Sequence, residues 1–144
     1  MIRNEKEMNN FAKEFLKSIS KQLKTGVVVL LSGDLGAGKT FFAAKLLKHL
    51  GVKEDVGSPT FVIKKDYQVK DIKVQHLDLY RIPSEAEAYE LGFLEDAAEN
   101  SLVLIEWPEV AKGLIKTLPK TVAVYALEII KLGETTREVR VIKW

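Results

Sequence analysis

The sequence predicts an α/β domain whose sheet has a parallel core, antiparallel strands added beside it, and flanking helices. Residues 27–31 and 102–105 are continuous apolar runs, which is typical of parallel strands covered on both faces. Runs with helical periodicity separate them, and later segments alternate as antiparallel strands do. A length of 144 residues suits one compact domain over residues 1–144, with no linker or repeat.

The first third of the chain predicts helix, strand and helix. Apolar residues recur at helical spacing over residues 4–23, and Asn4 with Glu7 has the spacing of a capping box. Residues 27–31 then form a buried strand, and a glycine-rich turn follows. A second helix is expected over residues 39–50, where Gly51 ends it.

The remaining segments predict two antiparallel additions around a second buried strand. Strand-like runs at 60–67 and 72–78 are close enough to form a hairpin. Short helices are expected over 83–90 and 93–99, before the strand at 102–105 and a helix over 108–115. Two alternating strands, 121–130 and 137–144, end the chain around a turn at 132–134.

Composition excludes several classes of protein. The chain has 22 Lys+Arg against 20 Asp+Glu, without the basic stripe of an autonomous nucleic-acid binder. It has no cysteine, which excludes disulfides and thiolate chemistry, and its two histidines make a multi-His metal site improbable. No run approaches the ~20 apolar residues of a membrane span, and the first residues lack a signal peptide's apolar core. We therefore expect a cytoplasmic protein that does not enter a membrane.

The turn after the first strand reads GDLGAGKT over residues 33–40. It matches G-x-x-x-x-G-K-S/T at every fixed position, with the required strand before it and helix after it. A flexible glycine-rich connection with an exposed lysine is the alternative, and this context argues against it. The sequence therefore predicts a P-loop NTPase, whose nucleotide-binding residues are Gly33, Asp34, Leu35, Gly36, Ala37, Gly38, Lys39 and Thr40.

Such a loop binds a polyphosphate for physical reasons. Glycines let successive backbone N–H groups point at phosphate oxygens, and the following helix adds positive charge at its N-terminus. Lys39 would contact the β- and γ-phosphates, and the Thr40 hydroxyl would be a ligand of Mg²⁺.

A P-loop also needs an acidic residue near the metal, usually at the end of another buried strand. Glu106 follows the apolar run 102–105, and Asp78 ends the run 72–78. In isolation either could be a solvated carboxylate, but beside a P-loop Glu106 becomes the preferred metal-site acid. Asp78 is the weaker candidate for the same site.

Elimination narrows the class of NTPase. No N-K-x-D motif is present to read guanine, and the four arginines form no lid of the kind small-molecule kinases use. We expect Arg81 to make a structural ion pair rather than to act as an arginine finger. A minimal ATPase remains, with a small phosphotransferase or a non-hydrolysing, nucleotide-responsive binding module as alternatives.

Four motifs in order resemble the TsaE (YjeE) family, the bacterial ATPase of tRNA threonylcarbamoyladenosine biosynthesis. They are GDLGAGKT at 33–40, SPTF at 58–61, HLDLYR at 76–81 and IEWPE at 105–109. The resemblance implies catalytic roles for Lys39, Glu106 and Asp78, and a metal site at Thr40, Glu106 and Asp78. It implies that Thr60 senses the γ-phosphate or metal in a switch-like loop, although alone this stretch would be interpreted as a turn. Trp107 would lie at the edge of the site.

The same resemblance implies the biological setting. The cofactors would be ATP and Mg²⁺, and the partners would be TsaB and TsaD. TsaD transfers the threonylcarbamoyl group to adenosine 37 of tRNAs that decode ANN codons, and the ATPase subunit supports its turnover. The near-balanced charge of this chain agrees with leaving most tRNA contact to those partners.

Overall fold

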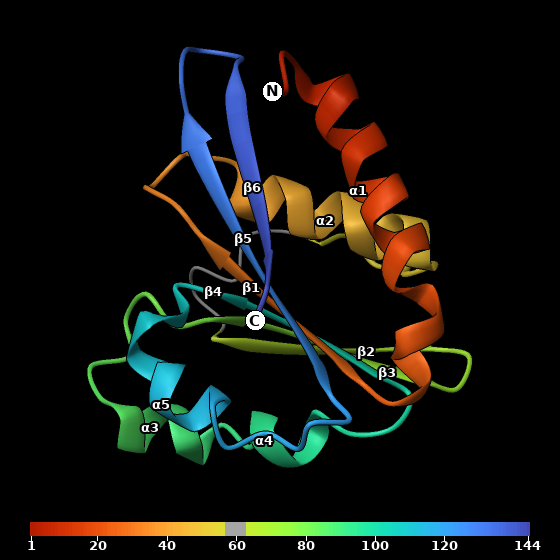
Figure 1. The fold of residues 1–144 in the computed structure, drawn as a ribbon, viewed down its shortest axis with the longest axis vertical. Helices are drawn as coiled ribbons and strands as arrows, with labels where there is room; N and C mark the ends of the chain where they lie inside the picture. The colour runs from red at the N-terminus through yellow and green to blue at the C-terminus, as the bar shows by residue number, and fades with distance from the viewer. Residues whose placement is uncertain (57–62) are drawn as a thin grey trace.

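A computed structural model describes residues 1–56 and 63–144 and contains one six-stranded sheet (Figure 1). The strand order is β2-β3-β4-β1-β5-β6. The strands are β1 (Val27–Ser32), β2 (Lys64–Val69), β3 (Ile72–Asp78), β4 (Ser101–Glu106), β5 (Ala123–Lys131) and β6 (Arg137–Lys143).

The sheet has the predicted division between a parallel core and antiparallel edges. β3, β4, β1 and β5 are mutually parallel, whereas β2 and β6 pair antiparallel at the two edges. All residues of β4 are buried, as are Val27–Leu31 of β1, because helices cover both faces of these strands. The predicted fold class, an α/β P-loop domain with a mixed sheet, is confirmed.

The helices α1 (Glu5–Ile19) and α2 (Lys39–Leu50) cover one face of the sheet (Figure 1). Asn4 caps α1 as predicted, with its side chain accepting a hydrogen bond from the Glu7 amide at 2.9 Å. The predicted single helix over 4–23 is wrong at its end, because residues 20–24 form the 3₁₀ helix η1 (Ser20–Lys24). The Ser18 and Ser20 hydroxyls donate to carbonyls three residues earlier, which competes with continued α-helical bonding.

The opposite face carries short helices in the lower part of Figure 1: α3 (Glu85–Glu90), α4 (Phe93–Asp96) and α5 (Lys112–Ile115). The 3₁₀ helix η3 (Pro108–Ala111) leads into α5. α4 ends earlier than the predicted residue 99. Its continuation is prevented because the Ala98 amide donates to the Ser101 hydroxyl oxygen at 3.0 Å.

Both predicted hairpins are present, with shifted boundaries, but only their outer strands β2 and β6 are antiparallel additions, because β3 and β5 belong to the parallel core. β2 begins at Lys64, and the predicted strand residues 60–62 lie outside the described residues. β5 runs two residues later at its start than predicted, and β6 ends at Lys143. β6 also receives an isolated bridge from Ile2, which brings the N-terminal segment to this edge.

The topology brings the predicted functional residues to one side of the sheet. Because β1, β3, β4 and β5 are parallel, their carboxyl ends lie along the same edge. The loops that leave these ends are therefore neighbours, as in other open α/β sheets that bind ligands there. In the part of the chain that the structure describes, no helix is long and apolar enough to cross a membrane.

Candidate functional site

The P-loop connects β1 to α2 and has a conformation that requires glycine. Gly33 has a φ of 143°, and a Cβ there would lie 2.3 Å from the carbonyl oxygen of Ile129. Gly38, at φ 110°, precedes the first turn of α2. Both conformations are in the region that side chains rarely adopt, so these glycines let the loop pass close to β5 and turn into the helix.

Lys39, the first residue of α2, folds back onto its own loop. Its Nζ donates to the carbonyl oxygens of Gly33 at 2.5 Å and Asp34 at 2.9 Å, and lies 4.2 Å from the centre of the Trp107 ring. Burial lowers the pKa of the Lys39 ammonium, against the opposing attraction of carboxylates led by Glu106. The ammonium is therefore held by loop carbonyls at the position where the motif places phosphate.

Thr40, Glu106 and His76 form a continuous hydrogen-bonded network. The Thr40 hydroxyl donates to Glu106 Oε1 at 2.8 Å, and Glu106 Oε2 lies 2.6 Å from His76 Nε2. Glu106 and His76 are both buried, and His76 Nδ1 has no partner among the described residues. Both carboxylate oxygens are thus engaged, so Glu106 is held in one orientation beside the P-loop threonine.

Asp78 lies beside Glu106, because the parallel register pairs these two residues at the ends of β3 and β4. The Asp78 carboxylate accepts a hydrogen bond from the Tyr80 amide at 2.9 Å. Burial raises the pKa of Asp78, and the charge of Glu106 adds to that rise; the Tyr80 amide, His76 and Lys39 oppose it. Two carboxylates therefore share this strand edge with one ammonium.

Trp107 has an unusual backbone conformation at the same edge. Its φ of 56° and ψ of 58° are left-handed, a strained state for a bulky side chain. The Trp107 amide donates to the Leu31 carbonyl at 3.2 Å, and its ring lies 4.8 Å from that of Tyr80. Strained residues of this kind gather at functional sites, and here the strain places the indole over Lys39.

A cavity of about 330 Å³ joins these groups. It lies between the P-loop and the ends of β3 and β4, and Arg81 also lines it. The residues around it are Leu35, Gly36, Gly38, Lys39, Thr40, Phe41, Asp78, Tyr80, Arg81, Glu106 and Trp107. The structure thus brings Lys39, Thr40, Asp78 and Glu106 to one cavity, whereas Thr60 lies outside the described residues.

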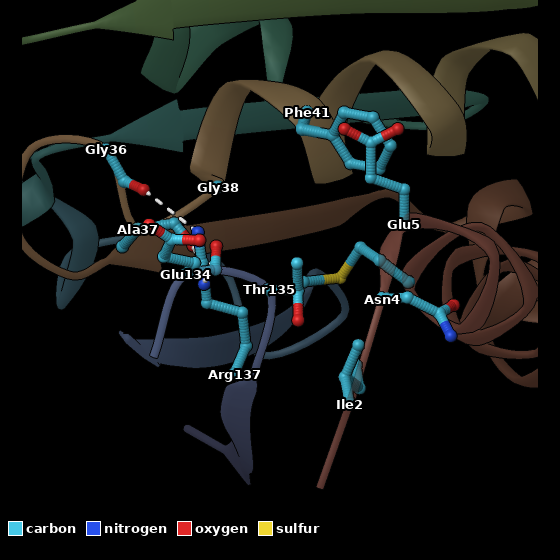
Figure 2. Close-up of a pocket in the computed structure, with 11 residues that line it drawn as sticks. Ile2, Asn4, Glu5, Gly36, Ala37, Gly38, Phe41, Glu134, Thr135 and Arg137 are labelled. Carbon is cyan, nitrogen blue, oxygen red and sulfur yellow. Dashed lines mark hydrogen bonds between the residues drawn. The ribbon is translucent and has the colours of Figure 1, made fainter. Parts of the chain in front are cut away.

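A second cavity, of about 270 Å³, adjoins the P-loop elsewhere (Figure 2). It shares Gly36, Gly38 and Phe41 with the first cavity, so the two meet at the loop. The N-terminal segment with the start of α1, and the turn that leads from β5 into β6, supply the other walls together with Ala37 of the P-loop. These wall residues are Ile2, Asn4, Glu5, Met8, Ala37, Glu134, Thr135 and Arg137. Sequence reasoning missed this cavity, because its walls come from distant segments and carry no motif.

The donor set fits Mg²⁺. No group of three or more His, Cys, Asp or Glu in the described ranges could hold a metal ion alone. Mg²⁺ instead uses oxygen ligands, commonly one or two carboxylates together with substrate phosphates. The Thr40 hydroxyl and Glu106 carboxylate are adjacent oxygen donors of that kind, with Asp78 next to them.

Comparison with known proteins places these features in a family. A sequence model described as "Threonylcarbamoyl adenosine biosynthesis protein TsaE" matches residues 2–139. A TsaE protein of Rickettsia typhi is 46% identical over 79% of this chain and 76% of its own length. The TsaE protein of Haemophilus influenzae is 33% identical over 79% and 73%. A crystal structure of Bacillus subtilis YdiB matches with a TM-score of 0.62 and 26% identity, over 94% of this chain and 78% of that one.

Proposed function

This chain belongs to the TsaE family of tRNA threonylcarbamoyladenosine biosynthesis, and on that premise we propose that it is a Mg²⁺-dependent ATPase of that process. One observation carries the proposal above the others. The P-loop lysine and the Thr40–Glu106 pair lie at one cavity, where a triphosphate and a divalent cation can be bound together.

The phosphates would bind where the Lys39 ammonium now meets loop carbonyls. Phosphate oxygens carry negative charge, so they attract the Lys39 ammonium more strongly than the neutral carbonyls of Gly33 and Asp34 do. The backbone N–H groups at the start of α2 add further donors. Nucleotide binding would therefore draw Lys39 from the loop carbonyls to the phosphates.

Metal binding follows from the charges of this edge. The two carboxylates of Glu106 and Asp78 outnumber the one ammonium of Lys39. The phosphates of a nucleotide bound without metal would therefore lie next to two negative charges. Thr40 and Glu106, with Asp78 beside them, would hold Mg²⁺, which when bound neutralises charge on the phosphate oxygens. The same charge balance supports a metal–nucleotide complex as the substrate.

The base and ribose would occupy the second cavity (Figure 2). Met8, Ile2 and Phe41 offer apolar contact for a flat ring, while Asn4 and Glu134 supply polar groups at the wall. We call this second cavity the base pocket. Because it shares Gly36, Gly38 and Phe41 with the first cavity, one nucleotide could extend from the base pocket to Lys39.

Hydrolysis would be slow in the isolated chain. Glu106 is bonded on both oxygens, which suits holding the metal side of the site or orienting water better than removing a proton. We propose that TsaB and TsaD act with this chain in the cytoplasm, that TsaD modifies adenosine 37 of the tRNA, and that nucleotide turnover here supports that transfer. Partner binding would then accelerate hydrolysis.

The test measures phosphate release from ATP·Mg²⁺ by the chain alone and with purified TsaB and TsaD. We expect release to be faster with the partners. Glu106→Gln should lower the rate by about 100-fold or more while ADP binding stays within a few-fold, because the amide keeps the shape but loses the charge. Glu99→Gln, at an exposed position outside the four motifs and both cavities, is the control.

Two results would change the proposal. Undiminished turnover by Glu106→Gln would remove this residue from hydrolysis. ATP binding without phosphate release, even with partners, would favour a nucleotide-responsive binding module, which the doubly bonded Glu106 also fits. Phosphate transfer stimulated by a small acceptor would instead indicate a phosphotransferase.

A further inference from the structure

Arg137, the first residue of β6, connects three segments that form the base pocket. Its Nε donates to the Ala37 carbonyl at 2.7 Å, and Nη2 lies 3.4 Å from the Gly36 carbonyl; Figure 2 shows this side chain reaching the loop. Nη1 donates to the carbonyls of Gly133, Glu134 and Thr136 in the β5–β6 turn. The backbone of Arg137 exchanges two hydrogen bonds with Ile2, at 2.7 and 2.6 Å.

The acceptors of Arg137 indicate that this side chain does more than stabilise its own hairpin. A residue that stabilised only the hairpin would need only the three carbonyls of the β5–β6 turn. The shortest hydrogen bond of this guanidinium instead reaches Ala37, 100 residues away in the sequence. These five acceptors are all backbone carbonyls, so the planar fork of N–H groups fixes backbone positions.

Arg137 and Lys39 divide the carbonyls of the P-loop between them. Lys39 bonds those of Gly33 and Asp34, at the beginning of the loop, and Arg137 bonds those of Gly36 and Ala37, in its middle. If Lys39 turned to phosphate, the bonds from Arg137 would not compete with that movement, because they use different carbonyls. They would keep Gly36, which lines both cavities, and Ala37 against the β5–β6 turn.

We propose that Arg137 is a positioning residue that assembles the base pocket by tying the P-loop to the β5–β6 turn and the N-terminal segment. The inference rests on the proposed nucleotide site, within which it assigns a role to a residue outside every motif. Arg137 acts through backbone carbonyls. Its loss should therefore weaken ligands that carry a base more than ligands that consist of phosphate alone.

The experiment compares Mg²⁺-ADP with Mg²⁺-tripolyphosphate by calorimetry on the full chain. Arg137→Gln should bind ADP about tenfold more weakly, because several hydrogen bonds of a charged donor are lost, and tripolyphosphate less than about threefold more weakly. Arg137→Lys should fall between this variant and the wild type, since one ammonium cannot span both the loop and the turn.

Arg140→Gln is the matched control, because Arg140 lies on the same strand but is exposed and pairs with Glu138 and Glu128. It should leave both affinities unchanged. Equal losses for ADP and tripolyphosphate in Arg137→Gln would overturn the inference, since they would indicate a charge effect on phosphate. Unchanged ADP binding would also overturn it.

Two further results distinguish a failure of this inference from a failure of the variant to fold or of the proposed nucleotide site. If Arg137→Gln does not fold, judged by its thermal unfolding, the ratio of the two affinities in Arg137→Lys decides between the same outcomes. If the wild-type chain binds neither ADP nor tripolyphosphate, the proposed nucleotide site fails as a whole, and the inference about Arg137 fails with it.

Discussion

The two cavities beside the P-loop are built in different ways. The cavity proposed to bind phosphate, here called the phosphate cavity, combines one continuous motif with the ends of two adjacent parallel strands. The charged residues in its lining are Lys39, Asp78, Arg81 and Glu106. The base pocket combines the N-terminal segment, the end of the P-loop and the β5–β6 turn, and its walls are mostly apolar or backbone. A local motif therefore supplies part of the first cavity and strand pairing the rest, whereas the second cavity depends on tertiary contacts between segments without a motif.

This difference also separates what each cavity contributes to binding. Charge-assisted hydrogen bonds to phosphate at the phosphate cavity would be individually strong and would depend on single side chains. The base pocket depends on shape, and on Arg137 keeping its walls together. Substitutions at the two cavities should consequently differ in size and in which ligand they affect.

The largest effect is expected at Lys39. Lys39→Ala removes the only motif ammonium, so binding of ADP and of tripolyphosphate should both weaken by about 100-fold or more. Calorimetry with each ligand measures the change, and Lys48→Ala, at an exposed position of α2, is the control. If tripolyphosphate bound Lys39→Ala as well as the wild type, the assignment of the phosphate cavity would be wrong.

Sequence reasoning predicted the phosphate cavity because its determinants are short-range or topological. The run at 33–40 is read directly, and Glu106 and Asp78 were candidates because each ends a strand-like run in a chain that has a P-loop. The parallel pairing of β3 with β4, which places the two acids side by side, was not predicted. The resemblance to the TsaE family strengthened both assignments and is confirmed. The role proposed for Thr60 stays a prediction, since this residue is outside the described ranges.

Sequence reasoning could not reach the remaining features, for identifiable reasons. The partnership of His76 with Glu106 depends on the register of β3 against β4, which pattern alone does not fix. Arg137 begins an alternating strand, and nothing in that pattern indicates that its side chain reaches residues 36 and 37. The ends of α1 and α4 were wrong because serine hydroxyls compete for backbone groups, a local effect that periodicity does not detect.

A smaller and more selective effect is expected at Thr135 in the base pocket. This residue is exposed, so Thr135→Trp should leave folding intact while its ring fills part of the cavity. ADP binding should weaken by about tenfold, because fitting the introduced indole ring and the adenine ring into one cavity costs on the order of 1–3 kcal/mol. Tripolyphosphate binding should not change. Competition calorimetry measures both, with Thr135→Ser as the control. Equal weakening of both ligands would show that the two cavities do not act separately.

The smallest effect is expected at Asp78, on the free energy of unfolding. It tests whether a buried carboxylate of the phosphate cavity lowers the stability of the folded protein. The pKa of Asp78 is raised in the folded state above its usual 3.8, chiefly by burial. The stability that its protonated form contributes is therefore present below the unfolded pKa and is lost as pH rises through the folded value. Asp78→Asn removes this loss and can still accept the Tyr80 amide.

Without nucleotide, Asp78→Asn should accordingly be more stable than the wild type at pH 7, by a small margin because solvent screens a half-buried carboxylate. The difference should shrink toward pH 4, and urea unfolding across this range measures it. Asp71→Asn, in the exposed β2–β3 turn, should show no such trend. Binding of Mg²⁺-ATP should weaken in the same variant. If Asp78→Asn were less stable than the wild type at pH 7, the Asp78 charge would contribute to folding. The phosphate cavity would then lower the free energy of unfolding no more than the base pocket does.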